Sequence, residues 1–385
     1  MDTNFLISRR LRALRERAGQ TQEQLSDALG FKDRQIVSKI ETGERAISAE
    51  ELVRLANHYV QPLEYFTDPF RLDGEARFSW RKSHGADEEK VLAFEDKAAR
   101  WIALYRLLAR AEGEKPSPLG RRISLTSKSS FEEAQQVGEA TAKQIGFESV
   151  TTQKLKDSLE ELGILVLYVD ATPEISGAAC QIASTYAMDV IFINRNETIF
   201  RRKFDLAHEF FHLLTWDVMA PKHFENNTSV VENGRSRVEG VNSNDRTSRV
   251  ERLADNFASG LLMPMKALEP YLSKKPLSEI NSWLNETATA FGVSSSALRY
   301  RLKNCGLLSA SERDGIDESK IRNNGSAVPS AQRPALFSCR FMDVVGKGIA
   351  EGRISVSKCC SLLELSPKKL SSVFTEYGMR APFET

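Results

Sequence analysis

The run "FDLAHEFFHLL", residues 204–214, contains the pattern His-Glu-x-x-His at His208, Glu209 and His212. On a helix, positions four apart lie on the same face one turn apart, so both imidazoles project toward one point. Two imidazole nitrogens at this spacing can occupy adjacent corners of a tetrahedral zinc site. Glu209 directly follows the first histidine, where its carboxylate can act as the general base that activates water. The chain has only five histidines, so the pattern is improbable by chance.

A zinc site of this kind needs a third protein ligand, and a second predicted helix offers one. The run "RVERLADNFASGLLMP" places Glu251 and Asp255 four residues apart. Glu251 can bind the metal while Asp255, one turn later, can hold a ligating histidine through its other ring nitrogen. The alternative is a buried amphipathic helix whose histidines are satisfied by hydrogen bonds, and spacing alone leaves it open.

Short strands and further helices must position these residues. The runs "GILVLYVDA", "ISGAACQIA" and "DVIFINRN" read as three β-strands, and residues 131–161 read as helical. We interpret the strand ending in "VIFIN" as a sheet edge against which an extended peptide can bind. Residues 78–110 are predicted to form mainly a long helix, whose apolar positions suggest a partly buried connector or a dimer face.

The runs "FINRN", "RRKFDLAHEFFHLL" and "VERLADNFASGLLMP" together resemble the ImmA/IrrE family of zinc metallopeptidases, over approximately residues 70 to 310. The family is often paired with or fused to Xre-type DNA-binding modules. The resemblance implies that Zn²⁺ is bound by His208, His212 and Glu251. It further implies that Glu209 activates water and that Asp255 orients a ligand.

Two features depart from the common pattern of that family. Phe210 and Phe211 stand between the histidines where smaller residues are usual, and residues 217–249 form a long polar segment. We interpret this segment as a loop that covers the site or is itself cleaved. His84 and His223 are interpreted as solvated histidines outside the metal site.

Residues 8–66 read as short helices separated by turns, with Thr21 as a helix cap, Gln24 as its capping-box partner and Gly30 as a helix stop. The string "TQEQLSDALG…IVSKIETGER" resembles the Xre helix-turn-helix family, with one extra residue after Gly30. The resemblance implies base contacts by Arg34, Gln35, Ser38 and Lys39, and phosphate contacts by Gln22 and the arginines of the first helix. The alternative is a small bundle used only for protein docking.

The C-terminal third carries weaker signals. The run "LSEINSWLNETATAFGVSSSALRYRLKNCGLL" reads as helix, turn and helix and looks like a winged-helix-like tail, with Arg299, Arg301 and Lys303 on a basic face. Residues 309–335 are polar with Gly and Pro, which is typical of a linker. Beyond them, Ser355 and Ser366 cap the helices of a small unit that we interpret as serving docking or dimerisation.

Composition limits the remaining choices. The chain has 385 residues and a net charge of +1, so DNA binding must come from a local surface. No apolar run approaches the ~20 residues that span a bilayer. The five cysteines are scattered without Cys-x-x-Cys spacing, which favours reduced thiols in a cytoplasmic protein.

The predicted fold is multidomain α+β: an N-terminal all-α helix-turn-helix bundle, a central zincin-like α+β metallopeptidase with a small sheet, and C-terminal helical modules. The predicted parts are residues 1–70 for the DNA-binding domain, 71–130 for a helical connector, 131–308 for the peptidase-like domain, 309–335 for a linker and 336–385 for a small helical domain.

Two functions fit this organisation. In the first, the chain is a homodimeric regulator on double-stranded operator DNA whose gluzincin-like zinc endopeptidase cleaves a repressor or antitoxin, its own chain included, when a signal arrives. In the second, it is a zinc-containing transcriptional regulator or antitoxin-like component without proteolytic turnover. No membrane partner is expected in either case.

Overall fold

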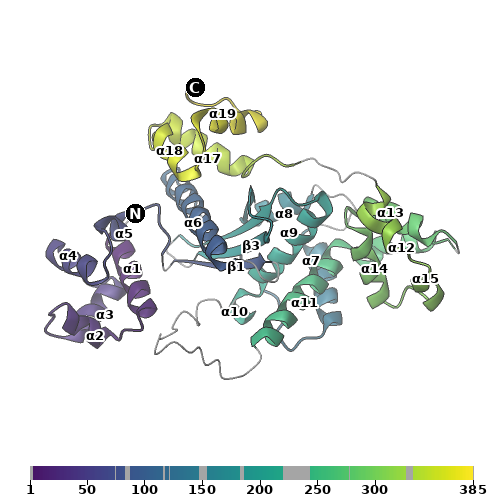
Figure 1. Ribbon diagram of the computed structural model, residues 1–385, viewed down its shortest axis with the longest axis horizontal. Coiled ribbons are helices and arrows are strands. Elements are labelled where there is room, and N and C mark those ends of the chain that lie inside the picture. Colours follow the sequence, from purple (N-terminus) through teal and green to yellow (C-terminus); the bar gives the residue numbers. More distant parts are fainter. Residues whose placement is uncertain are drawn as a thin grey trace.

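The computed structural model of the chain describes residues 3–73, 75–82, 87–115, 118–120, 122–146, 154–182, 186–219, 243–276, 278–326 and 333–384. Figure 1 shows a helical N-terminal bundle beside a central sheet, with helices above the sheet and further helices at the far end. Buried apolar side chains of the described residues gather in three clusters: one in the N-terminal bundle and one on each side of the sheet. This arrangement confirms the predicted fold class.

The N-terminal bundle forms as its cap and stop signals predict. Thr21 and Gln24 make the predicted capping box, and Gly30 adopts the left-handed conformation that ends the second helix (φ +68°). Tyr65 and Phe66 are buried at 3% and 0% exposure and close the core of the bundle. The five helices are α1 (Thr3–Arg17), α2 (Gln22–Ala28), α3 (Arg34–Thr42), α4 (Ala49–His58) and α5 (Leu63–Thr67).

The central sheet has four strands in the order β1-β3-β4-β2. The antiparallel pairs are β1 with β3 and β3 with β4, whereas β2 and β4 are parallel. The strands are β1 (Ala76–Lys82), β2 (Leu165–Val169), β3 (Ile175–Ile182) and β4 (Met188–Asn194). The last three are the strands predicted from the sequence. However, β4 is an interior strand, so our interpretation of the "VIFIN" run as a sheet edge is wrong.

The two faces of the sheet bury different helices, because successive side chains of a strand point to opposite faces. Val190 and Phe192 of β4 belong to the cluster shared with α6 (Glu88–Ala111). Ile191 and Ile193 belong to the cluster shared with α9 (Ile199–Leu214). In β1, Phe78 packs on the α6 side.

The first part of the segment predicted as mainly helical is instead strand β1. Phe78 and Trp80 stack in parallel with ring centroids 5.3 Å apart. Ser79 between them and Arg81 after them are polar. That alternation has the period of a strand rather than of a helix. The helix starts only at Glu88, after Asp87 caps it through the backbone N–H of Glu89. The helical connector therefore begins with the edge strand of the sheet.

Helices α7 (Phe131–Gln144) and α11 (Ser243–Leu262) pack at very short range through two glycines. A Cβ at Gly138 would lie 2.3 Å from the backbone oxygen of Phe257, and one at Gly260 would lie 2.1 Å from that of Gln135. Real Cβ atoms do not approach backbone this closely, so only glycine permits the contact. Three further helices of the central part of the chain are α8 (Lys154–Glu161), α10 (Trp216–Met219) and α12 (Met265–Leu272).

We therefore expect Gly260→Ala to destabilise the central domain strongly. The obstructing atoms are backbone atoms, so no rotamer change relieves the overlap and α11 must move away from α7. The expected loss is about 3 kcal/mol, at the upper end of the usual cost of overpacking. Urea denaturation would measure it, with Ser259→Ala on the same helix as the control. Equal midpoints for the two variants would contradict the close packing.

The segment predicted as a linker is partly helical. Ser309 forms a capping box with Glu312, Asp317 caps the next helix, and Ile321 is 1% exposed. The polar composition of the segment did not predict these helices, because serine and aspartate are common both in loops and at helix N-termini. Helices α13 (Ile280–Phe291) and α14 (Ser295–Asn304) precede this segment. Helices α15 (Ala310–Asp314) and α16 (Glu318–Ile321) and the 3₁₀ helix η2 (Arg322–Gly325) lie within it.

The predicted basic face of α14 is also incomplete. Arg301 is 1% exposed and donates hydrogen bonds to Gln135 and Glu139 of α7 and to the backbone oxygen of Met263. Arg299 is paired with Glu318. Helical spacing places a residue on a face but does not say whether another helix covers that face.

The C-terminal helices pack on α6 and share its cluster (Figure 1). A Cβ at Gly348 would lie 2.7 Å from Leu108, which shows how closely the two parts approach. Ser355 and Ser366 cap their helices as predicted. The helices are α17 (Cys339–Ala350), α18 (Val356–Leu363) and α19 (Pro367–Glu376). No helix in the described ranges has the length and apolar character to span a membrane.

Candidate metal centre

The two histidines of the His-Glu-x-x-His pattern lie in the buried half of α9. Thr198 caps this helix by accepting a hydrogen bond from the backbone N–H of Arg201. His208 is 0% and His212 is 5% exposed, with ring centroids 4.9 Å apart. The spacing therefore brings both rings to one place, as predicted.

Three donor atoms from α9 and α11 converge. The Nε2 atoms of His208 and His212 are 3.1 Å apart. Glu251 places Oε2 3.0 Å from His208 Nε2 and Oε1 3.5 Å from His212 Nε2. Ligands of a tetrahedral zinc ion with bonds near 2.05 Å are separated by about 3.3 Å, so the three donors match a single small cation in type and spacing. Among the described residues, His208, His212 and Glu251 form a group that could hold a metal ion. One donor atom from each side chain lies within 4.8 Å of the other two.

Asp255 fixes the tautomer of His208. Its Oδ1 lies 2.9 Å from His208 Nδ1. Partial burial would raise the pKa of Asp255, but the hydrogen bond from His208 lowers it below its usual value, which favours the ionised carboxylate as the acceptor. A ring whose Nδ1–H donates to Asp255 has its Nε2 directed toward His212 and Glu251. Carboxylates that hold histidines in this way orient metal ligands in many proteins.

The hydrogen bonds within the centre favour the ionised form of Glu251. Burial alone would raise the pKa of Glu251, but hydrogen bonds with both histidines lower it well below the usual range. Burial lowers the pKa of His212. The side chains of Glu251 and Asp255 are 40% and 45% exposed, so the centre is open to solvent on the α11 side.

Glu209 is buried beside the donor set without a hydrogen-bond partner among the described residues. It is 0% exposed, and neither carboxylate oxygen is hydrogen-bonded. Burial raises the pKa of Glu209 to about 8. Gly177 of β3 leaves room for it, since a Cβ there would lie 3.3 Å from Glu209 Oε1. A buried carboxylate with no partner is costly, which marks it as a candidate for a chemical role.

The bulky residues between the histidines pack against α11, and the ring of Phe211 also lies edge-on to that of His212, with centroids 5.6 Å apart. Phe210 and Phe211 are fully buried, and both rings pack against Phe257 of α11. They serve the contact between the two helices that carry the donor set. The predicted polar loop lies largely outside the described residues, as do His84 and His223, whereas its final part, from Ser243, belongs to α11.

Sequence reasoning missed Arg81 of β1. Its guanidinium lies 2.7 Å from Asp205 Oδ1 and 3.0 Å from Asp255 Oδ1. Arg81 pairs with Gly177 across the strands, which places it on the α9 side of the sheet. The alternation of apolar and polar residues in "FSWRK" was the available signal. Even that signal could not connect residue 81 with residues 205 and 255.

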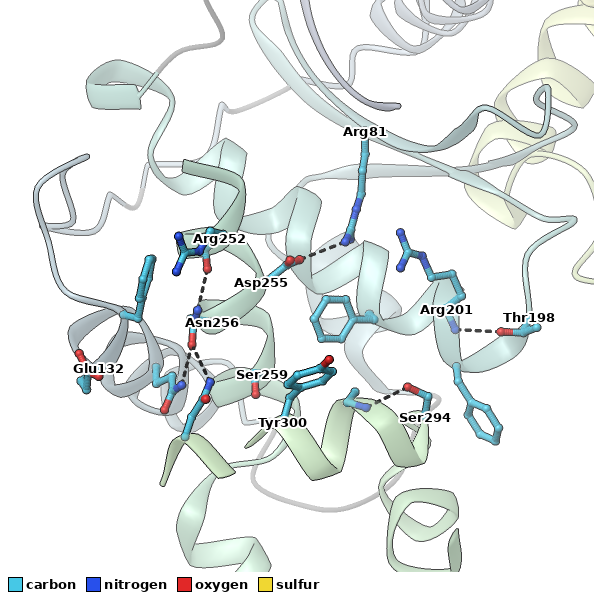
Figure 2. Close-up of a pocket in the computed structure, with 16 residues that line it drawn as sticks. Arg81, Glu132, Thr198, Arg201, Arg252, Asp255, Asn256, Ser259, Ser294 and Tyr300 are labelled. Atoms are coloured by element: carbon cyan, nitrogen blue, oxygen red, sulfur yellow. Dashed lines mark hydrogen bonds and ion pairs between the residues drawn. The ribbon is translucent and has the colours of Figure 1, made fainter. Parts of the chain in front are cut away.

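A cavity of 820 Å³ is lined by Asp255 and by residues of α7, α9, α11 and α14. Figure 2 shows Arg81 and Asp255 at one end and Tyr300 and Ser294 toward the other, with Arg201 and Thr198 on one side and Arg252 and Asn256 on the facing side. Arg252 stacks on Phe131 with its guanidinium carbon 4.5 Å from the ring centroid. The volume lies in the range of small-ligand and side-chain pockets.

The predicted DNA-contacting residues of α3 face solvent. Arg34, Gln35 and Lys39 are exposed and Ser38 is half-buried. They lie on one exposed side of the helix, whereas Val37 and Ile40 pack inward. Gln22 is half-buried and donates a hydrogen bond to Glu41, at 2.9 Å, and its contact with phosphate stays a prediction.

Two arginines of the first helix serve the bundle itself, contrary to the prediction of phosphate contacts. Arg10 is 0% exposed and donates to the backbone oxygens of Tyr65, Asp68 and Arg71. Arg15 is paired with Glu41 at 2.6 Å. A count of basic residues on a helix cannot distinguish such internal roles from DNA contacts.

Family comparisons agree with this architecture. Residues 6–64 match a helix-turn-helix domain, and residues 159–303 match the IrrE N-terminal-like domain of a peptidase family. The comparison with curated proteins found no match.

The chain is therefore a regulator type in which a DNA-binding helix-turn-helix domain is fused to a domain of a metallopeptidase family. More particularly, that domain is IrrE-like and contains both histidines and Glu251. These matches confirm the fusion inferred from the sequence. They also leave β1, α6 and α7 outside the matched part, although these elements contact or complete the peptidase-like domain.

Proposed function

We propose that the chain is a transcriptional regulator whose zinc-dependent endopeptidase domain cleaves a specific regulatory protein, such as a repressor or an antitoxin, in response to a signal. One observation carries the proposal: the unpartnered carboxylate of Glu209 is buried beside three convergent donors, two nitrogens and one carboxylate oxygen. Structural metal sites have no use for such a group, whereas hydrolysis needs a base.

His208, His212 and Glu251 would hold Zn²⁺, for which two imidazoles and a carboxylate are a suitable donor set. When bound, zinc supplies a Lewis acid that polarises a peptide carbonyl and lowers the pKa of water. Asp255 keeps His208 in the tautomer that presents Nε2. In its ionised form, Glu209 would accept the proton of the attacking water and pass it to the leaving amine.

The substrate would bind as an extended segment along β1. In the described residues this strand pairs only with β3, so its other edge can accept a peptide strand. Arg81, near the end of β1, reaches the groove that contains Asp255. This replaces the role that the sequence suggested for β4.

The test compares protein N-termini in cells that express the wild-type chain with those in cells that express Glu209→Gln. New termini that require Glu209 would identify the substrate, the chain itself included. The comparison needs resting and DNA-damaged cultures, because cleavage in a regulator depends on a trigger.

The DNA-binding half is proposed to act as a homodimer on a palindromic operator, with α3 in the major groove. We expect Arg34→Ala to weaken binding to an operator selected from random DNA by about 1–3 kcal/mol and to relax the preference at one base position. Competition binding against the selected site and a scrambled site would measure both. An equal loss for the two sites would indicate a phosphate contact, and no loss would remove Arg34 from the interface.

A further inference from the structure

Arg81 connects the edge strand of the sheet to both helices of the candidate metal centre. Its Nη1 lies 2.7 Å from Asp205 of α9, and its Nη2 lies 3.0 Å from Asp255 of α11. Figure 2 shows the contact with Asp255 at the end of the cavity. Arg81 precedes the residues matched by the peptidase family, so the family match assigns it nothing.

The two carboxylates that contact the guanidinium differ in their burial. The side chain of Asp205 is 0% exposed and also accepts a hydrogen bond from Arg201, at 3.2 Å. Asp255 is 45% exposed and lies on the cavity wall, so it is less enclosed than Asp205. The buried Asp205 therefore anchors Arg81, and Arg81 in turn restrains Asp255.

One oxygen of Asp255 receives both contacts. Oδ1 accepts the Nη2–H of Arg81 and the Nδ1–H of His208, at 3.0 and 2.9 Å. A shift of this carboxylate would release the ring of His208 to rotate about its side-chain bonds. Rotation would move Nε2 away from His212 and Glu251, which lie 3.1 and 3.0 Å from it.

We propose that Arg81 is a positioning residue for the metal centre, which holds Asp255 against His208 and so keeps the donor set assembled. The inference rests on the proposed zinc site. Groups that orient metal ligands in this indirect way typically change metal affinity by about 10- to 100-fold when they are removed. Arginine suits the position because its planar fork can donate to two carboxylates at once, which lysine cannot reproduce.

The test measures Zn²⁺ affinity of the full chain by competition with a chelator of known affinity. Arg81→Met removes the link, and Arg252→Met is the matched control. Arg252 lines the same cavity but stacks on Phe131, and it forms no ion pair with the described residues of the centre. We expect Arg81→Met to bind zinc about 10- to 100-fold more weakly than the wild type and Arg252→Met to bind it equally well.

A second variant separates positioning from stability. Arg81→Met leaves the buried Asp205 without one partner and lowers the thermal midpoint of the zinc-free chain. Arg81→Met combined with Asp205→Asn removes that buried charge, so the midpoint should recover while zinc affinity stays weak. Recovery of both quantities would reduce Arg81 to a structural role and overturn the inference. Wild-type protein that binds no zinc would overturn the proposed function, and the inference with it.

Discussion

Replacing Glu209 with glutamine is expected to abolish proteolysis and leave zinc binding intact. The two side chains have the same shape, and the site around Gly177 accommodates either. The amide cannot accept the proton of water, so the loss in cleavage rate should reach the full contribution of a general base, about 10²- to 10⁴-fold. Zinc content by mass spectrometry and cleavage of the substrate found in cells would measure the two effects.

A matched comparison makes this result decisive. His212→Ala should lose zinc and cleavage together, whereas Glu209→Gln should lose only cleavage. If Glu209→Gln retained every activity of the wild type under resting and damaging conditions, the domain would be a zinc-bearing regulatory module without turnover. Loss of zinc in Glu209→Gln would instead show that the carboxylate is needed for the fold of the site.

The largest effect on stability is expected from Arg106→Met. Arg106 of α6 and Glu75, which precedes β1, form an ion pair at 2.6 Å with both side chains 1% exposed. Methionine would leave the Glu75 carboxylate buried and unpaired, which costs about 3–5 kcal/mol. Urea denaturation followed by tryptophan fluorescence would measure it, because Trp101 of α6 is buried in the cluster that this helix shares with the sheet and Trp80 packs against that cluster.

Arg100→Met on the same helix is the control. Its carboxylate partners Asp96 and Glu364 are 53% and 41% exposed, so breaking these exposed pairs should change stability by less than about 1 kcal/mol each. Glu75→Gln combined with Arg106→Met should recover much of the loss, because no buried charge then remains. A destabilisation of Arg106→Met no larger than that of Arg100→Met would show that the pair contributes little to the fold.

The candidate donor set could be predicted because its information is local. His208 and His212 are one helical turn apart, and Glu251 and Asp255 repeat that spacing on a second helix. Helix caps were equally predictable, since Thr21 and Ser355 accept hydrogen bonds from backbone groups within three residues. Short-range geometry fixes these relations before the chain folds.

Contacts between distant segments could not be predicted in this way. Arg81 meets residues more than a hundred positions later, and Arg301 meets Gln135 across a similar gap. Arg301 was interpreted as part of a basic face, and Arg81 was not singled out in the sequence. Charge and spacing do not reveal which solvent-facing side of one element another element will cover, so buried arginines such as Arg10 were mistaken for binding residues.

The position of β1 also constrains how this gene can be divided. A fragment that begins at residue 131 would encode every candidate zinc donor, yet it would lack the strand that carries Arg81 and the helix α6 that covers one face of the sheet. The segment from α5 to β1 spans only residues 68–75, so a fragment that separates the DNA-binding bundle from an intact sheet must begin within these residues.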